Sequence, residues 1–140
     1  MIASACLLLP WLQGGGVFVG SGTVTFDNCH IYSNRCTYEN HPGGGVDIRG
    51  GTVNFNNCNI YYNSNNYFAG GVVVAQASAT FDNCNIYSNH APEGGGGIAI
   101  FQGTATLLNC QIYSNTGTPG PNVFVDQSSV CTVGMSLTGV

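Results

Sequence analysis

Asp47 and Arg49 are the two residues of this chain whose types and spacing come closest to a catalytic pattern. They lie two positions apart in one short apolar run, and alternate residues of a β-strand project from the same face. A carboxylate beside a guanidinium can supply acid–base chemistry to a polar substrate. Glu39 and His41 lie a few residues upstream and would complete the best catalytic constellation that the sequence contains.

The neighbouring repeats weaken this catalytic interpretation. The residues that align with Asp47 in the next two repeats are Val73 and Ala99. No second acid therefore joins the pair, and the plainer interpretation of Asp47 and Arg49 is a solvated ion pair. We accordingly expect the protein not to be an enzyme.

Histidine and cysteine give no metal-binding pattern. His30, His41 and His90 are scattered, and the sequence has no Cys-x-x-Cys pair, which is the spacing typical of zinc sites. We expect no metal and no cofactor.

Four cysteines recur within a repeated motif, Asn-Cys-x-Ile-Tyr-x-Asn. Their spacings are 29, 26 and 26 residues, and they are Cys29, Cys58, Cys84 and Cys110. A fixed period of this length is typical of a solenoid, in which each repeat buries its apolar face against its neighbours. In such a fold the four cysteines form one inward column. Adjacent rungs are close enough for a disulfide, but we expect free thiols, since buried cysteine commonly behaves as a small apolar residue.

Each repeat contains three short β-like runs. In the first repeat these are Gly16-Val17-Phe18-Val19, Thr23-Val24-Thr25-Phe26 and Cys29-His30-Ile31-Tyr32, and the same columns recur in every repeat. Period-2 alternation places Val17, Val19, Val24, Phe26, Cys29 and Ile31 inside. The many β-branched residues and the recurrent glycines argue against helices.

Asparagines mark the corners between the runs. The corner after the second run carries Asn28, Asn57, Asn83 and Asn109. Asparagine tolerates the left-handed backbone that a sharp corner needs, and we expect these amides to hydrogen-bond from coil to coil as a ladder. A second corner carries Asn34, Asn63, Asn89 and Asn115, and glycine clusters mark the return to the first run.

Three runs and three corners in a coil of about 26 residues predict an all-β fold, a right-handed parallel β-helix of about four to five coils with three short strands per coil. The chain resembles the pectate-lyase-like β-helix superfamily. Its repeats resemble the polymorphic outer-membrane-protein type, which pairs a Gly-Gly-apolar-apolar element with Phe-x-x-Asn. Gly15-Gly16-Val17-Phe18 and Ile31-Tyr32-Ser33-Asn34 fit, with isoleucine in place of phenylalanine. The resemblance implies polysaccharide lyases or hydrolases as one outcome, and adhesins or cell-surface proteins as another.

The repeats divide the chain into predicted segments. Residues 1–13 form an apolar N-terminal cap, or the remnant of a signal or longer chain. The coils span about 14–42, 43–69, 70–95 and 96–121, with a partial coil at 122–133 and a tail at 134–140. So few coils leave open strand edges at both ends, and open edges need covering. We therefore expect end-to-end packing on a partner, or flanking sequence.

Composition restricts the partners. Only 6% of the 140 residues are charged and the net charge is −4, so the basic surface needed for nucleic acid is missing. The apolar run near the N-terminus is too short to span a bilayer, which takes about 20 residues. We expect no nucleic-acid partner and no membrane span, and favour the cell exterior, the cell surface or an organelle lumen over the cytosol.

Two outward columns are candidate binding surfaces. Tyrosine follows the inward isoleucine in every repeat, at Tyr32, Tyr61, Tyr87 and Tyr113, and predicts an exposed ladder. Tyrosine is enriched at protein interfaces and also stacks on sugars. The second column is a short Thr-x-Thr array, which resembles those of ice-binding proteins but is interrupted by Asn54 and Ser78.

The leading hypothesis is a non-catalytic structural or protein-interaction module, an accessory subunit of a larger assembly or a cell-surface protein. Its partner would be another protein chain, docked at a coil end or on the tyrosine face. The alternative is a β-helix that binds or degrades polysaccharide through Asp47, Arg49 and the tyrosines. Ice binding is the third hypothesis.

Overall fold

The computed structural model describes residues 2–3, 15–37 and 43–135. Their strands form three five-stranded sheets and one two-stranded sheet. The first sheet contains β2 (Val17–Val19), β6 (Val46–Ile48), β10 (Val72–Ala75), β13 (Ile98–Phe101) and β16 (Val123–Val125). The second contains β3 (Thr23–Asp27), β7 (Thr52–Asn56), β11 (Ser78–Asp82), β14 (Thr104–Leu108) and β17 (Val130–Gly134). The third contains β1 (Ile2–Ala3), β4 (His30–Tyr32), β8 (Asn59–Tyr61), β12 (Asn85–Tyr87) and β15 (Gln111–Tyr113).

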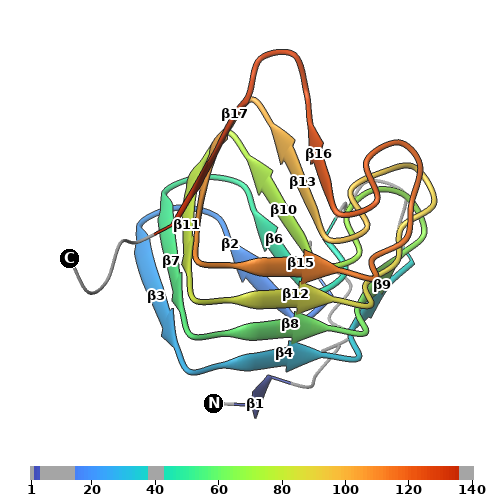
Figure 1. The fold of residues 1–140 in the computed structure, drawn as a ribbon, viewed down its shortest axis with the longest axis horizontal. Coiled ribbons are helices and arrows are strands. Elements are labelled where there is room, and N and C mark those ends of the chain that lie inside the picture. The colour runs from blue at the N-terminus through green and yellow to red at the C-terminus, as the bar shows by residue number, and fades with distance from the viewer. Residues whose placement is uncertain (1, 4–14, 38–42, 136–140) are drawn as a thin grey trace.

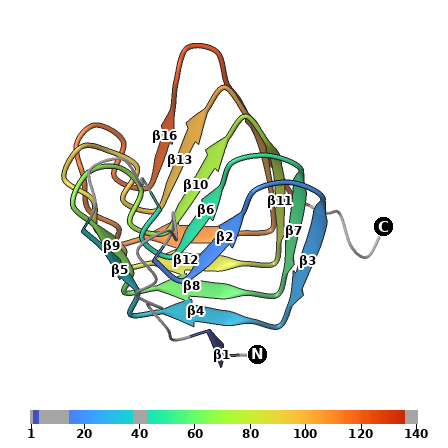
Figure 2. The ribbon, with the colours of Figure 1, turned by 180° about the vertical axis from the view of Figure 1, so that it is seen from behind.

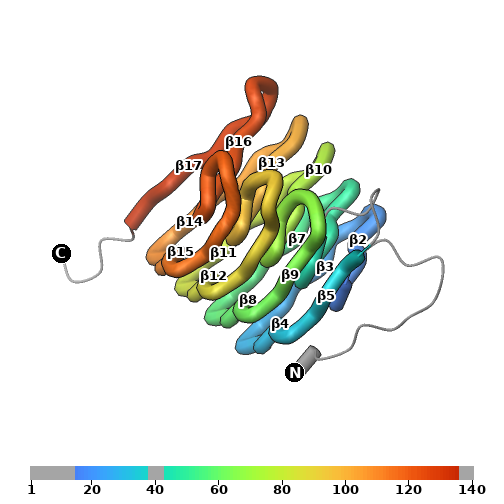
Figure 3. The backbone as a smooth tube through the Cα atoms, turned by 90° about the vertical axis from the view of Figure 1, so that its right-hand side faces the viewer, coloured from blue at the N-terminus to red at the C-terminus, as the bar shows by residue number. Residues whose placement is uncertain are grey.

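Successive coils stack in register, so that each strand lies on its counterpart one repeat earlier (Figure 1). All the pairings are parallel; for example, Phe55 lies opposite Phe81, and Ile60 opposite Ile86. The rungs form one continuous pile from the blue to the red end (Figure 3). The predicted all-β, right-handed parallel β-helix is confirmed, with about four full turns. A fourth, two-residue strand was not predicted: β5 (Arg35–Cys36) pairs with β9 (Ser64–Asn65) in the long return loop.

The core is the tube enclosed by the three sheets. Residues that alternation places inside are buried or half-buried, including Val19, Val53, Ile60 and Ile86. Phenylalanines of the second sheet stack along the axis, with ring centroids 5.0 Å apart for Phe26–Phe55 and 4.7 Å for Phe55–Phe81. Each coil thus gains its apolar burial mainly from the coils on either side.

The first corner has the predicted backbone. Asn28, Asn57, Asn83 and Asn109 have φ values of 53°, 52°, 53° and 51°, in the left-handed region that asparagine tolerates better than most residues. The predicted amide ladder, however, is not what these side chains build. Asn28, Asn57 and Asn83 are exposed, and the amide of Asn83 donates to the adjacent Asp82. Because the corner turns its side chains outward into water, little favours rung-to-rung bonding there.

The hydrogen-bonded ladder lies instead at the second corner. Asn34, Asn63, Asn89 and Asn115 are buried. The side-chain amide of each of the first three donates to Oδ1 of the next, over 3.0 Å in each case. The same Oδ1 atoms also accept from the preceding rung's backbone N–H. The left-handed residue of this corner is the one just before each asparagine, for example Ser33 at φ 57°, and it turns the amide inward.

Glycine at the start of the first run leaves room for this ladder. A Cβ on Gly45 would lie 2.9 Å from Cγ of Asn63 and 2.7 Å from the carbonyl oxygen of Gly71. Real Cβ atoms essentially never come that close. The Gly-Gly-apolar element therefore reflects close packing of the first run against the buried asparagines.

The two ends of the β-helix are staggered. At the N-terminal end β1 extends the third sheet beyond the first coil, whereas at the other end β16 and β17 extend the first and second sheets beyond β15. The predicted cap at residues 1–13 lies, apart from β1, outside the described residues. The predicted tail at 134–140 is described only at Gly134, which ends β17, and at Met135.

Candidate interaction surfaces

The four predicted tyrosines form a continuous stack on the outside of the third sheet. Successive ring centroids of Tyr32, Tyr61, Tyr87 and Tyr113 are 5.1, 5.0 and 5.2 Å apart, and the rings lie within 8° of parallel. The ladder is less exposed than expected, because each ring covers the face of its neighbour. Tyr32, Tyr61 and Tyr87 are half-buried, and Tyr113, on the last rung, is exposed. The stack presents ring edges to solvent.

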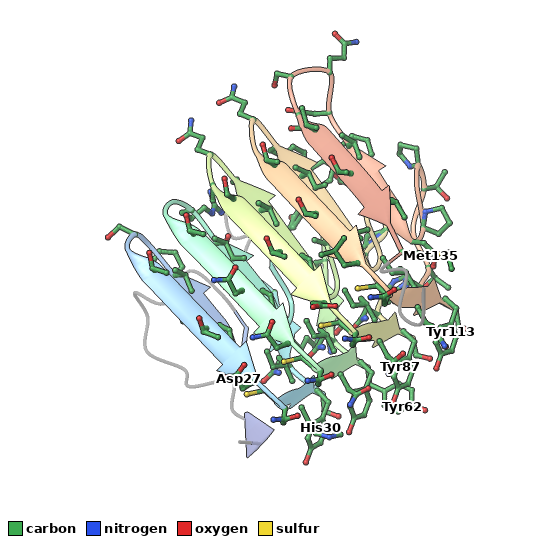
Figure 4. The ribbon with its side chains drawn as sticks, turned by 60° about the vertical axis from the view of Figure 1, so that its left-hand side comes forward. Asp27, His30, Tyr62, Tyr87, Tyr113 and Met135 are labelled. Carbon is green, nitrogen blue, oxygen red and sulfur yellow. The ribbon has the colours of Figure 1, made fainter. Side chains whose placement is uncertain are left out.

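Tyr62 adds a fifth tyrosine beside this stack, one that the column of repeated tyrosines does not predict. Its ring meets Tyr61 and Tyr87 edge-on, at centroid distances of 5.5 and 6.3 Å and interplanar angles of 71°. It is 62% exposed and has a left-handed φ of 55°. The signal was present in the motif: the residue before the last asparagine is serine in the other three repeats. Figure 4 shows Tyr62 beside Tyr87 and Tyr113 along the third sheet.

The aromatic wall is defined here as Tyr32, Tyr61, Tyr62, Tyr87 and Tyr113. His30 borders it, with its ring 6.1 Å from Tyr61 in a T-shaped arrangement. Burial and, after it, the neighbouring phenols Tyr61, Tyr113 and Tyr62 raise the pKa of Tyr87. Tyr87 is therefore neutral at ordinary pH, and it offers a ligand an apolar ring edge and a neutral hydroxyl group.

The second sheet presents the predicted Thr-x-Thr array in register. Thr23, Thr52, Ser78 and Thr104 lie in one row, and Val130 continues it. A parallel row contains Thr25, Asn54, Thr80, Thr106 and Thr132. The row that begins at Thr23 is exposed on all five rungs. In the row that begins at Thr25, the three central residues Asn54, Thr80 and Thr106 are half-buried. Ice binding by this face stays a prediction.

Asp47 and Arg49 form the predicted ion pair, but the pair is not solvated. Nε of Arg49 lies 2.6 Å from Oδ1 of Asp47, whose side chain is 0% exposed. The side chain of Arg49 is 32% exposed. Glu39 and His41, the other members of the predicted constellation, lie outside the described residues.

Beside Asp47, the outer face of the first sheet is covered. Val73 and Ala99, its neighbours in the outward column, are also fully buried. They form a second apolar cluster with Ala69, and Phe68 packs nearby against Phe101 at 5.5 Å. The return loops, at the left of Figure 2, thus fold back onto this sheet. The apolar outward residues Val73 and Ala99 were the sequence signal for such a cover.

The cysteine column lies inside the tube as predicted. Cys29, Cys58 and Cys84 are buried and Cys110 is half-buried, all as free thiols. The thiols of Cys58, Cys84 and Cys110 each donate to a backbone carbonyl on the preceding rung over 3.3 Å. The thiols of Cys110 and Cys58, followed by burial, raise the pKa of Cys84, and burial raises that of Cys29. The hydrogen bond with the Cys84 thiol lowers the pKa of Cys58 to about 6 and that of Cys110 to about 7. The column is a packing element in which raised and lowered thiol pKa values alternate from rung to rung.

Within residues 15–37 and 43–135, no cluster of three or more histidine, cysteine or acidic side chains is arranged to hold a metal ion. In the same part of the chain, no helix is long and apolar enough to cross a membrane.

Comparison with known proteins identifies the fold at family level. The family model described as the right handed beta helix region matches residues 15–136, which is most of the chain. No curated protein and no solved structure matches the chain. The finer resemblance to polymorphic outer-membrane-protein repeats stays a prediction.

Proposed function

We propose that this chain, which belongs to the right-handed β-helix family, is a non-catalytic protein-interaction module that binds a protein partner through its aromatic wall. It would serve as an accessory subunit or as a surface protein. The β-helix provides a rigid scaffold, because its rungs are fixed by continuous parallel pairing. The function would then lie in one outward column of side chains.

The proposal depends mainly on the exposed side chain and left-handed backbone of Tyr62. A large aromatic side chain occupies a left-handed backbone position, where the other three coils have serine. The ring is 62% exposed and therefore contributes little to the core. Bulky residues at positive φ are uncommon, and such outliers gather at functional sites. Exposed tyrosines with neighbouring aromatic rings are typical anchors of protein interfaces.

The geometry of the wall favours a protein partner over a sugar. Carbohydrate recognition by tyrosine uses the open face of the ring, and here the inner faces are covered by stacking at about 5 Å. What remains for a ligand is a row of edges and hydroxyl groups with the Tyr62 ring beside it. Such a surface suits a flat protein patch with an apolar centre and hydrogen-bonding groups around it.

Geometry also supports the non-catalytic part of the proposal. The carboxylate of Asp47 is buried and engaged by Arg49, and a general acid or base must reach its substrate within hydrogen-bonding distance. Polysaccharide binding or cleavage is the competing hypothesis, and the two differ in the molecule that contacts Tyr62.

Site-specific photo-crosslinking tests the proposal. The photoreactive phenylalanine analogue benzoyl-phenylalanine replaces Tyr62 in the chain expressed in its source cells. Gln102 is the control position, since it is also exposed and left-handed, at φ 49°, but lies at a different corner. We expect a discrete protein adduct from position 62 that is absent from position 102. Adducts of equal yield at both positions, or a polysaccharide adduct at position 62, would overturn the proposal.

A further inference from the structure

The C-terminal end of the β-helix is an incomplete coil. β16 and β17 form the first two strands of a fifth coil, but no described strand lies on β15 to complete it. A hollow of about 400 Å³ lies above β15, where the described residues lack the third strand of the fifth coil. Its lining is mostly apolar and includes Cys110, Ile112, Val123, Val133 and Met135. Figure 4 shows Met135 near Tyr113 at this end of the molecule.

Core residues are left uncovered at this step. Val133 continues the inward column of Phe55, Phe81 and Leu107, yet it is 75% exposed. Met135 is 84% exposed. Exposed inward-column residues beside open strand edges are typical of an interaction site.

The opposite end of the same chain has the complementary step. There β1 extends the third sheet by one strand, while β2 and β3 are the last strands of the first and second sheets. Val17, Val24 and Phe26, the inward residues of β2 and β3, are only half-buried. Each of the three sheets has five described strands. The strand that the third sheet has in excess at the N-terminal end, β1, therefore corresponds to the strand that its described part lacks on β15 at the C-terminal end.

We infer that the C-terminal end binds the N-terminal end of a second copy of this chain, head to tail. The β1 strand of the second copy would lie on β15 and complete the fifth coil. Its β2 and β3 strands would then lie on β16 and β17. Each pairing repeats one that already exists between successive coils, with parallel direction and unchanged register.

The residues that would meet are chemically compatible in this register. Phe26 would lie on Val133, and Val24 on Cys131, which continues the apolar inward columns. Thr25 would lie on Thr132, and Asp27 on Gly134, so no like charges face each other. Asp27 is the only acidic or basic residue in β2, β3, β15, β16 and β17, so charge repulsion does not oppose the contact. Because the two contacting surfaces differ, the assembly would grow as an open filament.

Sedimentation of the purified 140-residue chain over about a hundredfold range of concentration tests this inference by mass action. We expect dimers and longer species whose share rises with concentration. Val133→Lys should weaken this association by at least about tenfold, because it places a charge against Phe26 of the next copy. Val130→Lys is the matched control: it lies on the same strand, is 55% exposed, and projects from the outer face.

A mixing experiment tests the head-to-tail direction. Val133→Lys retains its N-terminal end, so a small proportion of it should cap wild-type assemblies and shorten them, whereas Val130→Lys should not. A wild-type chain that stays monomeric at every concentration would overturn the inference. So would wild-type assemblies of unchanged length in the presence of Val133→Lys, or an equal effect of the two lysine variants.

Discussion

Asn63 donates from its side-chain amide to Oδ1 of Asn89 over 3.0 Å, and the backbone N–H of Asn63 donates to the same oxygen. The amide also donates to the carbonyl oxygen of Ile31, over 2.9 Å. Oδ1 of Asn63 accepts from both the backbone and the side chain of Asn34. This buried asparagine therefore links three successive coils by hydrogen bonds, and its side-chain nitrogen, side-chain oxygen and backbone N–H all have partners.

Substitution Asn63→Asp should strongly destabilise the protein. The carboxylate would replace the amide donor and place an oxygen against the acceptors of Asn89 and Ile31. Leaving buried polar groups without partners costs about 1–3 kcal/mol each, so we expect a loss of about 3 kcal/mol or more. Urea unfolding followed by circular dichroism would measure it.

Asn57→Asp is the matched control for this prediction. Asn57 is exposed at the other corner, and aspartate also tolerates its left-handed backbone. We expect a change within about 0.5 kcal/mol there, as is usual for surface positions. Equal losses at Asn57 and Asn63 would contradict the assignment of the ladder to the second corner.

The Asp47–Arg49 pair should contribute to stability through mutual coupling. Arg49→Ala would remove the guanidinium from a fully buried carboxylate. Breaking a buried pair from one side costs about 3–5 kcal/mol, and we expect about 2 kcal/mol, since Arg49 is one-third exposed. A double-mutant cycle with Asp47→Asn should give a coupling energy of about 1–3 kcal/mol. Additive losses would show that the pair is not coupled.

The buried thiols should resist alkylation in the folded protein. The adjacent thiols of Cys110 and Cys58, and after them burial, raise the pKa of Cys84, which lowers the fraction of reactive thiolate at pH 8. We expect burial to keep iodoacetamide from Cys29, Cys58 and Cys84. The half-buried Cys110, whose pKa the Cys84 thiol lowers to about 7, should react before the half-buried Cys131, whose pKa burial raises. Peptide mass spectrometry would identify the modified sites, with urea-unfolded protein as the fully reactive control. Rapid labelling of Cys84 in the folded chain would contradict the inward column.

Repetition explains why the fold could be predicted from the sequence. The spacing of Cys29, Cys58, Cys84 and Cys110 set the coil length, and alternation around Ile60 and Phe55 identified the inward faces. Those signals are local and recur in each repeat. The prediction of the ladder at the first corner is wrong, because both corners carry asparagine and residue type does not distinguish them. Which corner turns inward depends on the left-handed residue before Asn63, a backbone property that residue type alone does not specify.

Sequence could predict less of the candidate site. Tyr61 and Tyr87 are half-buried because their rings stack across closely spaced rungs. The tyrosine ladder is therefore less exposed than the inward–outward alternation of the strand predicts. Burial of Val73 and Ala99 on the outer face depends on loop residues such as Ala69, which lie outside the three repeated runs. Tyr62 could have been found, because it departs from the serine that the other repeats place before the final asparagine.

The affinity of the crosslinked partner for Tyr62→Ser tests the central claim most directly. This variant gives the second coil the serine of Ser33, Ser88 and Ser114, so the fold should be retained. Gln102→Ser is the control at another exposed corner. By calorimetry we expect binding at least about tenfold weaker for Tyr62→Ser, the loss of an interface anchor, and unchanged binding for Gln102→Ser. Unchanged affinity of Tyr62→Ser would contradict the account.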